Sequence, residues 1–175
     1  FDDVSVKNIE DRLGSELLSN TGYETAGGGG ADIWADWVEE AGDGTLTNEV
    51  VLVHSGNDAA KITTGASDNT YVAQGVTTEI GKLYKLNLWT RGDGVTAGMY
   101  YISGVTSVYV STGVSGTTST EVSVYFTATS TTTNIYFKAG PTSGDIAYVD
   151  DISCKENINN SGVHIVSSKG GATQS

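Results

Sequence analysis

The chain has 175 residues, a net charge of −12 and 23 glycines, and only 17% of its residues are charged. This composition excludes a coiled coil or a helical bundle, which would need many more Ala, Glu, Lys, Leu and Arg residues. The acidic field would repel a nucleic-acid backbone or an anionic membrane, so we expect neither as a partner. The length corresponds to one domain of ordinary size with short flanking segments.

Alternating apolar and polar residues predict short antiparallel strands along the chain. In chain order, the runs are 49–53, 59–63, 70–76, 84–91, 98–103, 106–111, 122–126, 135–139 and 146–154. Turn sequences at 55–58, 92–94 and 141–144 separate several of them. We therefore expect an all-β antiparallel sandwich, a jelly roll of about eight to ten strands, with helix only as a turn around residues 8–13.

The same alternation predicts which side chains fill the core of this sandwich. The expected core residues are Leu86, Leu88, Val122, Val124, Phe126, Ile135, Phe137 and Ile152.

A short internal repeat occurs near the two ends of the sequence. Residues 1–7 are FDDVSVK and residues 149–155 are VDDISCK. Two short strands can match by coincidence, and this alternative stays open. The repeat otherwise indicates that residues 1–7 end a preceding copy of one module. The complete module is then 16–155, the preceding tail with its linker is 1–15, and 156–175 is a linker or the start of a following segment.

Five motifs follow one another between residues 16 and 155. They are ELLSNTGYE at 16–24, Trp37, HSGNDAA at 54–60, QGV at 74–76 followed by GKLYKLNLWTR at 81–91, and YVDDIS at 148–153. In this order they resemble carbohydrate-binding modules of the family 4/9/22 type. The resemblance implies a galactose-binding-like jelly roll, a fold that also occurs in phage tail and fibre proteins.

The resemblance also implies a structural calcium ion that joins Glu24 to Asp150 or Asp151. Adjacent side chains of a strand face opposite ways, so only one of the two Asp residues can reach the ion unless a bulge intervenes. Calcium takes about six to eight oxygen ligands, some of which turns can supply as backbone carbonyls. The alternative is that the Asp pair ends a strand and caps a turn.

Aromatic and polar residues outside the predicted core are candidates for binding a sugar, whose C–H face stacks on rings while its hydroxyls meet polar groups. Some family members place binding loops beside the glycine-rich stretch 26–32, for which we expect a flexible loop. The alternative is that these large side chains pack under loops. The candidates are Trp89, Arg91, Asn87, Gln74, Tyr125, Tyr136, Trp34 and Trp37.

We expect no catalytic residues. The only histidines are His54 and His164, and no carboxylate pair or phosphate-binding loop forms a recognisable motif. The single Cys154 excludes an internal disulfide and a cysteine-rich zinc site.

The sequence thus predicts a non-catalytic carbohydrate-binding module of a larger multimodular protein. Its partners would be a neutral polysaccharide or glycan and the neighbouring modules of the parent protein. The alternative is a structural or adhesion module of a phage tail, virion appendage or bacterial surface protein. In both cases the expected location is extracellular, either secreted or on a virion surface.

Overall fold

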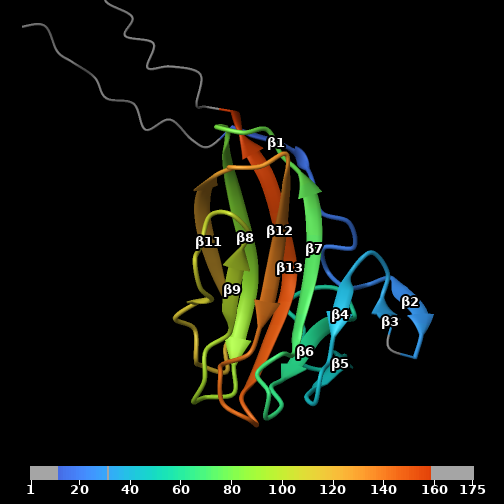
Figure 1. Cartoon of the computed structure of the whole chain (residues 1–175). Helices are drawn as coiled ribbons and strands as arrows, with labels where there is room; N and C mark the ends of the chain where they lie inside the picture. Colours follow the sequence, from blue (N-terminus) through green and yellow to red (C-terminus); the bar gives the residue numbers. More distant parts are fainter. Residues whose placement is uncertain (1–11, 31, 159–175) are drawn as a thin grey trace, which may run out of the picture.

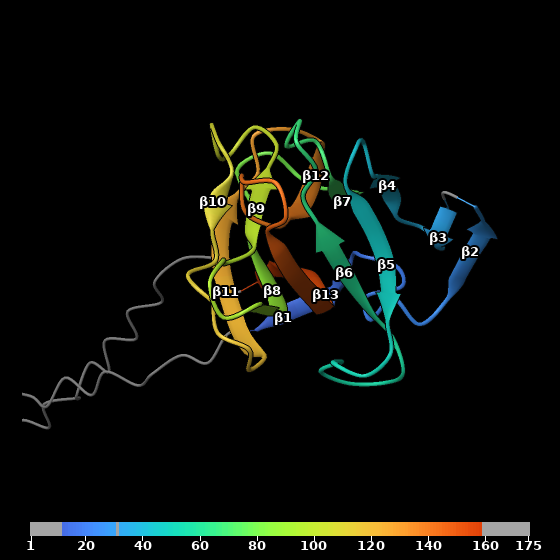
Figure 2. The same cartoon turned by 90° about the horizontal axis from the view of Figure 1, so that it is seen from below.

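Two antiparallel sheets face each other in the computed structural model, which describes residues 12–30 and 32–158 (Figures 1 and 2). The first sheet has the order β11 (Thr120–Thr127), β8 (Leu83–Gly92), β13 (Ile146–Asn157), β6 (Ala59–Thr63), β5 (Thr45–Glu49), and β1 (Leu13–Glu16) also pairs with β13. The second sheet has the order β10 (Val110–Ser111), β9 (Met99–Ile102), β12 (Thr132–Lys138), β7 (Tyr71–Thr77), β4 (Val38–Glu40). The all-β jelly-roll sandwich predicted from the sequence is confirmed.

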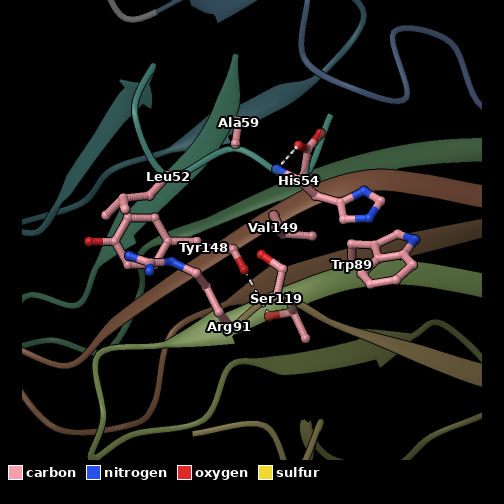
Figure 3. A pocket seen from close by; sticks show the side chains of 10 residues that line it. Leu52, His54, Ala59, Trp89, Arg91, Ser119, Tyr148 and Val149 are labelled. Carbon is pink, nitrogen blue, oxygen red and sulfur yellow. Dashed lines mark hydrogen bonds between the residues drawn. The ribbon is translucent and has the colours of Figure 1, made fainter. Parts of the chain in front are cut away.

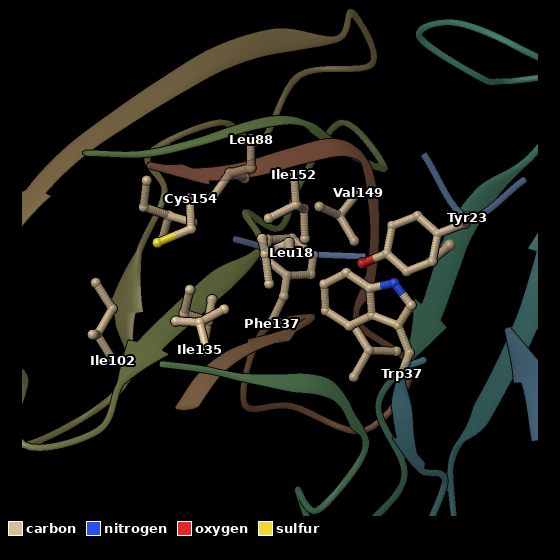
Figure 4. Packing of buried hydrophobic residues seen from close by; sticks show 14 of the residues in the cluster. Leu18, Tyr23, Trp37, Leu88, Ile102, Ile135, Phe137, Val149, Ile152 and Cys154 are labelled. Carbon is tan, nitrogen blue, oxygen red and sulfur yellow. The ribbon is translucent and has the colours of Figure 1, made fainter. Parts of the chain in front are cut away.

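The core lies between the two sheets, where the alternation placed it (Figure 4). Six of the predicted core residues are buried, namely Leu86, Leu88, Phe126, Ile135, Phe137 and Ile152. The other two, Val122 and Val124, are partly buried and pack against this cluster. Each large apolar side chain buried in this way contributes about 1.5–3 kcal/mol to folding.

The described residues form thirteen strands, more than the alternation indicated. Short edge strands such as β4 and β10 have too few residues to show a period of two. The apolar run 49–53 was expected to be a strand, but β5 ends at Glu49, where that run begins. The Glu49 carboxylate accepts the N–H groups of Val51 and Leu52 at 2.9 and 3.1 Å, which turns the chain out of the sheet.

The expected flexible loop at 26–32 contains a short hairpin in the structure. Strand β2 (Ala26–Gly29) pairs with β3 (Asp32–Trp34), and the hairpin projects from one side of the sandwich (Figure 1). The helical turn expected at 8–13 lies outside the described residues except for Arg12 and Leu13, and Leu13 begins β1.

Strand β13 contains a bulge at the Asp pair. Asp150 pairs with Trp89 of β8, but the next pair joins Ser153 to Asn87, so β13 has one extra residue there. Asp151 takes a left-handed backbone conformation with φ 46°. The bulge breaks the strict alternation of side chains, and both Asp residues contact the segment that precedes β6.

Within the described residues, the structure contains no helix of the length and apolarity that a membrane span requires.

Candidate ligand-binding site

Tyrosine side chains gather on the outward face of the second sheet. In β12, Tyr136 points away from the core because its neighbours Ile135 and Phe137 are buried. The register places Tyr136 beside Ala73 of β7 on one side and beside Tyr101 of β9 on the other. The sequence pattern of three strands therefore brings one row of side chains to the surface.

Four rings form a connected group, which we call the tyrosine face: Tyr71, Tyr101, Tyr109 and Tyr136. The centre of the Tyr136 ring lies 5.4 Å from that of Tyr71 and 5.5 Å from that of Tyr101. The Tyr101 ring lies 5.5 Å from that of Tyr109, which comes from the segment between β9 and β10. Tilted rings at these distances attract one another. All four side chains are partly exposed, so the group presents aromatic surface to solvent.

A hollow of about 130 Å³ adjoins the tyrosine face. The small residues Ala73 and Gly75 line it together with Tyr71, Tyr136 and the amide of Asn134. Because Ala73 and Gly75 carry little or no side chain, a flat ligand can approach the sheet here and still touch the ring of Tyr136. The Asn134 amide can both donate and accept hydrogen bonds to such a ligand.

A larger hollow of about 460 Å³ lies at the end of the same sheet, beside Met99 of β9 and Ser111 of β10. Its other walls come from the loops 95–97 and 140–145. The Asp145 carboxylate ties these loops together by accepting the hydroxyl of Thr96 and a backbone N–H group of its own loop, both at 2.9 Å. The second sheet therefore borders two depressions, one beside the tyrosine face and one at the end of the sheet.

The one lysine of β12 is neutralised within the tyrosine face. Lys138 is only 3% exposed, and its ammonium contacts the carboxylate of Asp68. It also donates to the Asp68 carbonyl at 3.2 Å and lies 4.9 Å from the centre of the Tyr109 ring. This ion pair removes the positive charge of Lys138 from the site, while the exposed carboxylate of Glu40 in β4 lies beside Tyr71.

The hydroxyls of Tyr71 and Tyr109 on this face stay protonated at neutral pH. Burial, followed by the effects of Tyr71, Tyr136 and Asp68, raises the pKa of Tyr109 to about 12. Burial, followed by the effect of Glu40, also raises the pKa of Tyr71. These hydroxyls therefore remain hydrogen-bond donors as well as acceptors.

The outward face of the first sheet carries Trp89, which is partly exposed, but one face of its ring is covered by His54. His54 stacks on Trp89 with ring centres 3.6 Å apart and planes 11° apart, and Figure 3 shows the two rings lying over one another. The depression lined by Trp89, His54, Arg91 and Tyr148 is too shallow to hold a water molecule. The guanidinium of Arg91 lies 4.0 Å from the centre of the Tyr148 ring.

The other polar candidates on this first sheet also contact protein groups. The Asn87 amide donates to Glu121 at 2.9 Å and accepts the hydroxyl of Ser123 at 2.7 Å. Tyr125 is 48% exposed, and the ammonium of Lys85 lies 5.4 Å from its ring centre. Asn87 and Tyr125 thus lie on the same face as Trp89, whereas Tyr136 lies on the opposite side of the sandwich.

Three further candidates are buried, although Gln74 also borders the hollow beside the tyrosine face. Gln74 accepts the N–H group of Ser19 at 2.7 Å and donates to the carbonyls of Ser19 and Asp36 at 3.1 and 2.9 Å. Trp34 and Trp37 are 1% and 5% exposed and belong to the core. Their burial corresponds to the alternative that large aromatic side chains pack inside the fold.

The three carboxylates proposed as calcium ligands meet at the turn 54–58. One Asp150 oxygen accepts the N–H groups of residues 54 and 55 at 2.8 and 3.1 Å. One Glu24 oxygen accepts the N–H groups of residues 57 and 58 at 2.8 and 3.2 Å. Burial raises the pKa of Asp150, while these N–H donors oppose the rise. The first motif and the last strand are thus joined through one turn.

Asp151 binds the same turn through side chains. One of its oxygens lies 2.7 Å from Nδ1 of His54 and accepts the hydroxyl of Ser55 at 2.7 Å. Gly22 lies against all three carboxylates, since a Cβ atom there would be 3.4 Å from Asp151 Oδ1 and 3.5 Å from Cγ of Glu24.

These contacts bear on calcium binding, which stays a prediction. Over 12–30 and 32–158, no three His, Cys, Asp or Glu side chains are arranged to hold a metal ion. Several of the carboxylate oxygens at the turn already accept N–H donors. An ion here would need one or two carboxylates of this group together with backbone carbonyls, a ligand set that calcium accepts.

Sequence reasoning missed Tyr71, Tyr101 and Tyr109 as site residues. Tyr71 begins the predicted run 70–76 and Tyr101 lies in the run 98–103, so their alternation was visible. Their proximity to Tyr136 depends on which strands are neighbours, and a period of two in a single strand carries no such information.

Solved structures share this fold, although no protein-family model and no curated protein matches the chain. TmCBM61, solved in complex with beta-1,4-galactotriose, is 17% identical with a TM-score of 0.58 over 81% of this chain and 98% of that one. The CBM22-1 xylan-binding domain of Xyn10C from Paenibacillus barcinonensis is 7% identical with a TM-score of 0.59 over 84% and 96%. The enzymatically active domain of tailspike protein 4 from bacteriophage CBA120 is 14% identical with a TM-score of 0.56 over 81% and 21%. The fold is thus that of carbohydrate-binding modules, and it also forms part of a phage tailspike.

Proposed function

We propose that the chain is a non-catalytic module that binds a neutral polysaccharide or glycan on the tyrosine face. The observation that carries the proposal is the aromatic group beside a hollow lined by Ala73, Gly75 and Asn134. Aromatic rings suit the C–H faces of sugar rings, and the tyrosine hydroxyls with the Asn134 amide suit their hydroxyl groups. The shared fold with carbohydrate-binding modules supports the same function.

The charge of the chain supports the proposal of a neutral ligand. The chain has a net charge of −12, and within residues 12–30 and 32–158 the basic side chain at the tyrosine face, Lys138, is paired with Asp68. An acidic polysaccharide would be repelled by the chain and would find no unpaired cation at Lys138.

The proposed setting is a multimodular protein outside the cell, secreted or on a virion surface. In that setting the module holds its parent protein on a glycan and has neighbouring modules as partners. A second candidate is a structural or adhesion module without sugar affinity of its own. The likeness to a segment covering 21% of a phage tailspike chain favours this alternative.

Affinity electrophoresis separates the two candidates. Native gels would contain neutral polysaccharides such as β-1,4-galactan, xylan and a β-glucan, and polygalacturonate as an acidic control. We expect retardation in at least one neutral gel and none in the acidic gel. Unchanged mobility in every gel would favour the structural module instead.

A further inference from the structure

The heptapeptide 1–7 matches residues 149–155 of β13 at positions whose side chains are buried or make specific contacts. In 149–155, the apolar residues Val149, Ile152 and Cys154 are buried. Their counterparts in residues 1–7 are also apolar: Phe1, Val4 and Val6. The polar counterparts Asp2, Asp3, Ser5 and Lys7 are identical to those in 149–155.

The identical polar residues are not what a generic strand requires. Asp150 and Asp151 are consecutive because a bulge with φ 46° at Asp151 turns both toward the turn 54–58. Ser153 donates to the Glu16 carboxylate at 2.6 Å, and the Lys155 ammonium lies 3.7 Å from the same carboxylate. A simple alternating strand would need neither an Asp pair nor this Ser and Lys.

A second match occurs at the same spacing. Phe1 and Val149 are 148 positions apart, and so are Leu17 and Ile165. At this offset, LLSNTG at 17–22 aligns without a gap with IVSSKG at 165–170. The alignment conserves two aliphatic residues, the serine and the glycine. It ends at the next position, where Tyr23 is aligned with Gly171.

Two conserved positions of this second match, Leu18 and Gly22, have specific structural roles, whereas Ser19 acts through its backbone. Leu18 is buried, and the N–H group of Ser19 donates to Gln74 at 2.7 Å. Gly22 lies against the carboxylates that hold the turn 54–58. The start and the end of the described unit thus each have a counterpart displaced by the same distance.

We infer that the sequence is organised as a tandem repeat with a period of 148 residues. Residues 1–7 correspond to β13 of a preceding copy, and residues 162–170 correspond to the opening segment of a following copy. Both segments lie outside the described residues, and the inference rests on their sequence and on the tasks of their counterparts. The partner that adjoins this module is therefore another module of its own kind.

The structure also indicates where neighbouring copies are joined. The N–H group of Ile158 donates to the carbonyl of Arg12 at 2.8 Å, so the chain enters and leaves the module side by side. β13 ends at Asn157, and the counterpart of Leu13 in a following copy is residue 161. Three residues then connect successive modules at this end. If the tyrosine face binds sugar, which rests on the proposed function, such an array would bind a polymer with avidity.

Two measurements test the tandem repeat without any use of sugar binding. The first is to sequence the coding region on both sides of the segment that encodes this chain. We expect a turn like 54–58 starting about 96 residues before Asp2, because His54 and Asp150 are 96 positions apart. We also expect a tryptophan like Trp37 ten positions after Ser175, as the 148-residue offset requires. Unrelated sequence on both sides would overturn the inference.

The second measurement compares Asp2→Asn with Asp150→Asn in the full chain. Both carboxylate oxygens of Asp150 accept backbone N–H groups, so Asp150→Asn sets an amide NH2 group against an N–H donor and should lower the Tm by about 4 °C or more. Asp2→Asn should leave the Tm within about 1 °C of the native value, because Asp2 would hold the turn of a preceding copy and not the turn of this module. An equal loss in Asp2→Asn would show that residues 1–7 act within this module, which contradicts the tandem repeat.

Discussion

Tyr23 combines three unusual features in one residue. It has a left-handed backbone with φ 60°, it is 1% exposed, and its hydroxyl has no hydrogen-bond partner within the described residues. Its ring stacks on Trp37 at 4.9 Å and meets the edge of Trp34 at 5.3 Å, and Figure 4 shows its hydroxyl pointing toward the core. Burial, followed by the effects of Asp150 and Glu39, raises the pKa of Tyr23 well above its usual value.

Removing this hydroxyl should stabilise the module. Tyr23→Phe deletes a buried polar group that gains nothing from the fold, so the free energy of unfolding should rise by about 1 kcal/mol. Tyr84→Phe is the matched control, since the Tyr84 hydroxyl accepts the N–H group of Glu79 at 2.8 Å and its loss should cost about 1 kcal/mol. Urea unfolding measures both changes. Destabilisation of Tyr23→Phe to the same extent as the control would contradict this account of the hydroxyl.

At the scale of single elements, neighbouring residues of β12 have different expected roles. Phe137 stabilises the core, and Tyr136 belongs to the proposed binding site. Phe137 is 1% exposed, and truncation to Ala should cost about 3–5 kcal/mol of unfolding free energy. Tyr136→Ala, one residue earlier on the outward face, should cost clearly less because that ring is partly exposed. Thermal or denaturant unfolding of the two variants checks the face assignment. Near-equal losses, or a loss below about 1 kcal/mol for Phe137→Ala, would show that the assignment is inverted.

The turn 54–58 is the element at which calcium should act. An ion that binds only the folded chain stabilises it by about 2.7 kcal/mol when its free concentration is 100 times the Kd. We therefore expect millimolar calcium to raise the Tm by about 5–10 °C over excess chelator in the native chain. The rise should be much smaller in Glu24→Gln, and magnesium should act less than calcium. An unchanged midpoint in the native chain under both conditions would remove calcium from this account.

At the scale of the whole molecule, the sequence was sufficient for the fold class and most of the core. Alternation in 84–91 assigned Leu86 and Leu88 to the interior and Trp89 to the surface, because a buried sheet face imposes a period of two. The alternation gave a wrong prediction at 49–53. There the apolar run follows strand β5, which ends at Glu49, and the Glu49 carboxylate accepts an N–H group of the run. Local side-chain bonds of this kind are not visible in hydrophobic periodicity.

Less of the candidate site than of the fold could be predicted from the sequence. Tyr136 was identified, and the convergence of Glu24 with the Asp pair on one turn agrees with the motif order. Trp89 was expected to be available, but His54, 35 positions earlier in the chain, stacks on it. The tyrosine face combines strands β7, β9 and β12, and their adjacency is set by the topology of the whole sandwich.

The central claim is that sugar binds on the tyrosine face and not on the opposite sheet. The most direct test is titration calorimetry with the glycan that retards the native chain, applied to the native chain, Tyr136→Ala and Trp89→Ala. Loss of a central aromatic contact costs about 2 kcal/mol, so we predict a Kd roughly 30-fold weaker for Tyr136→Ala and within about 3-fold of native for Trp89→Ala. Circular dichroism would verify that both variants are folded. Native affinity in Tyr136→Ala together with a large loss in Trp89→Ala would contradict the account.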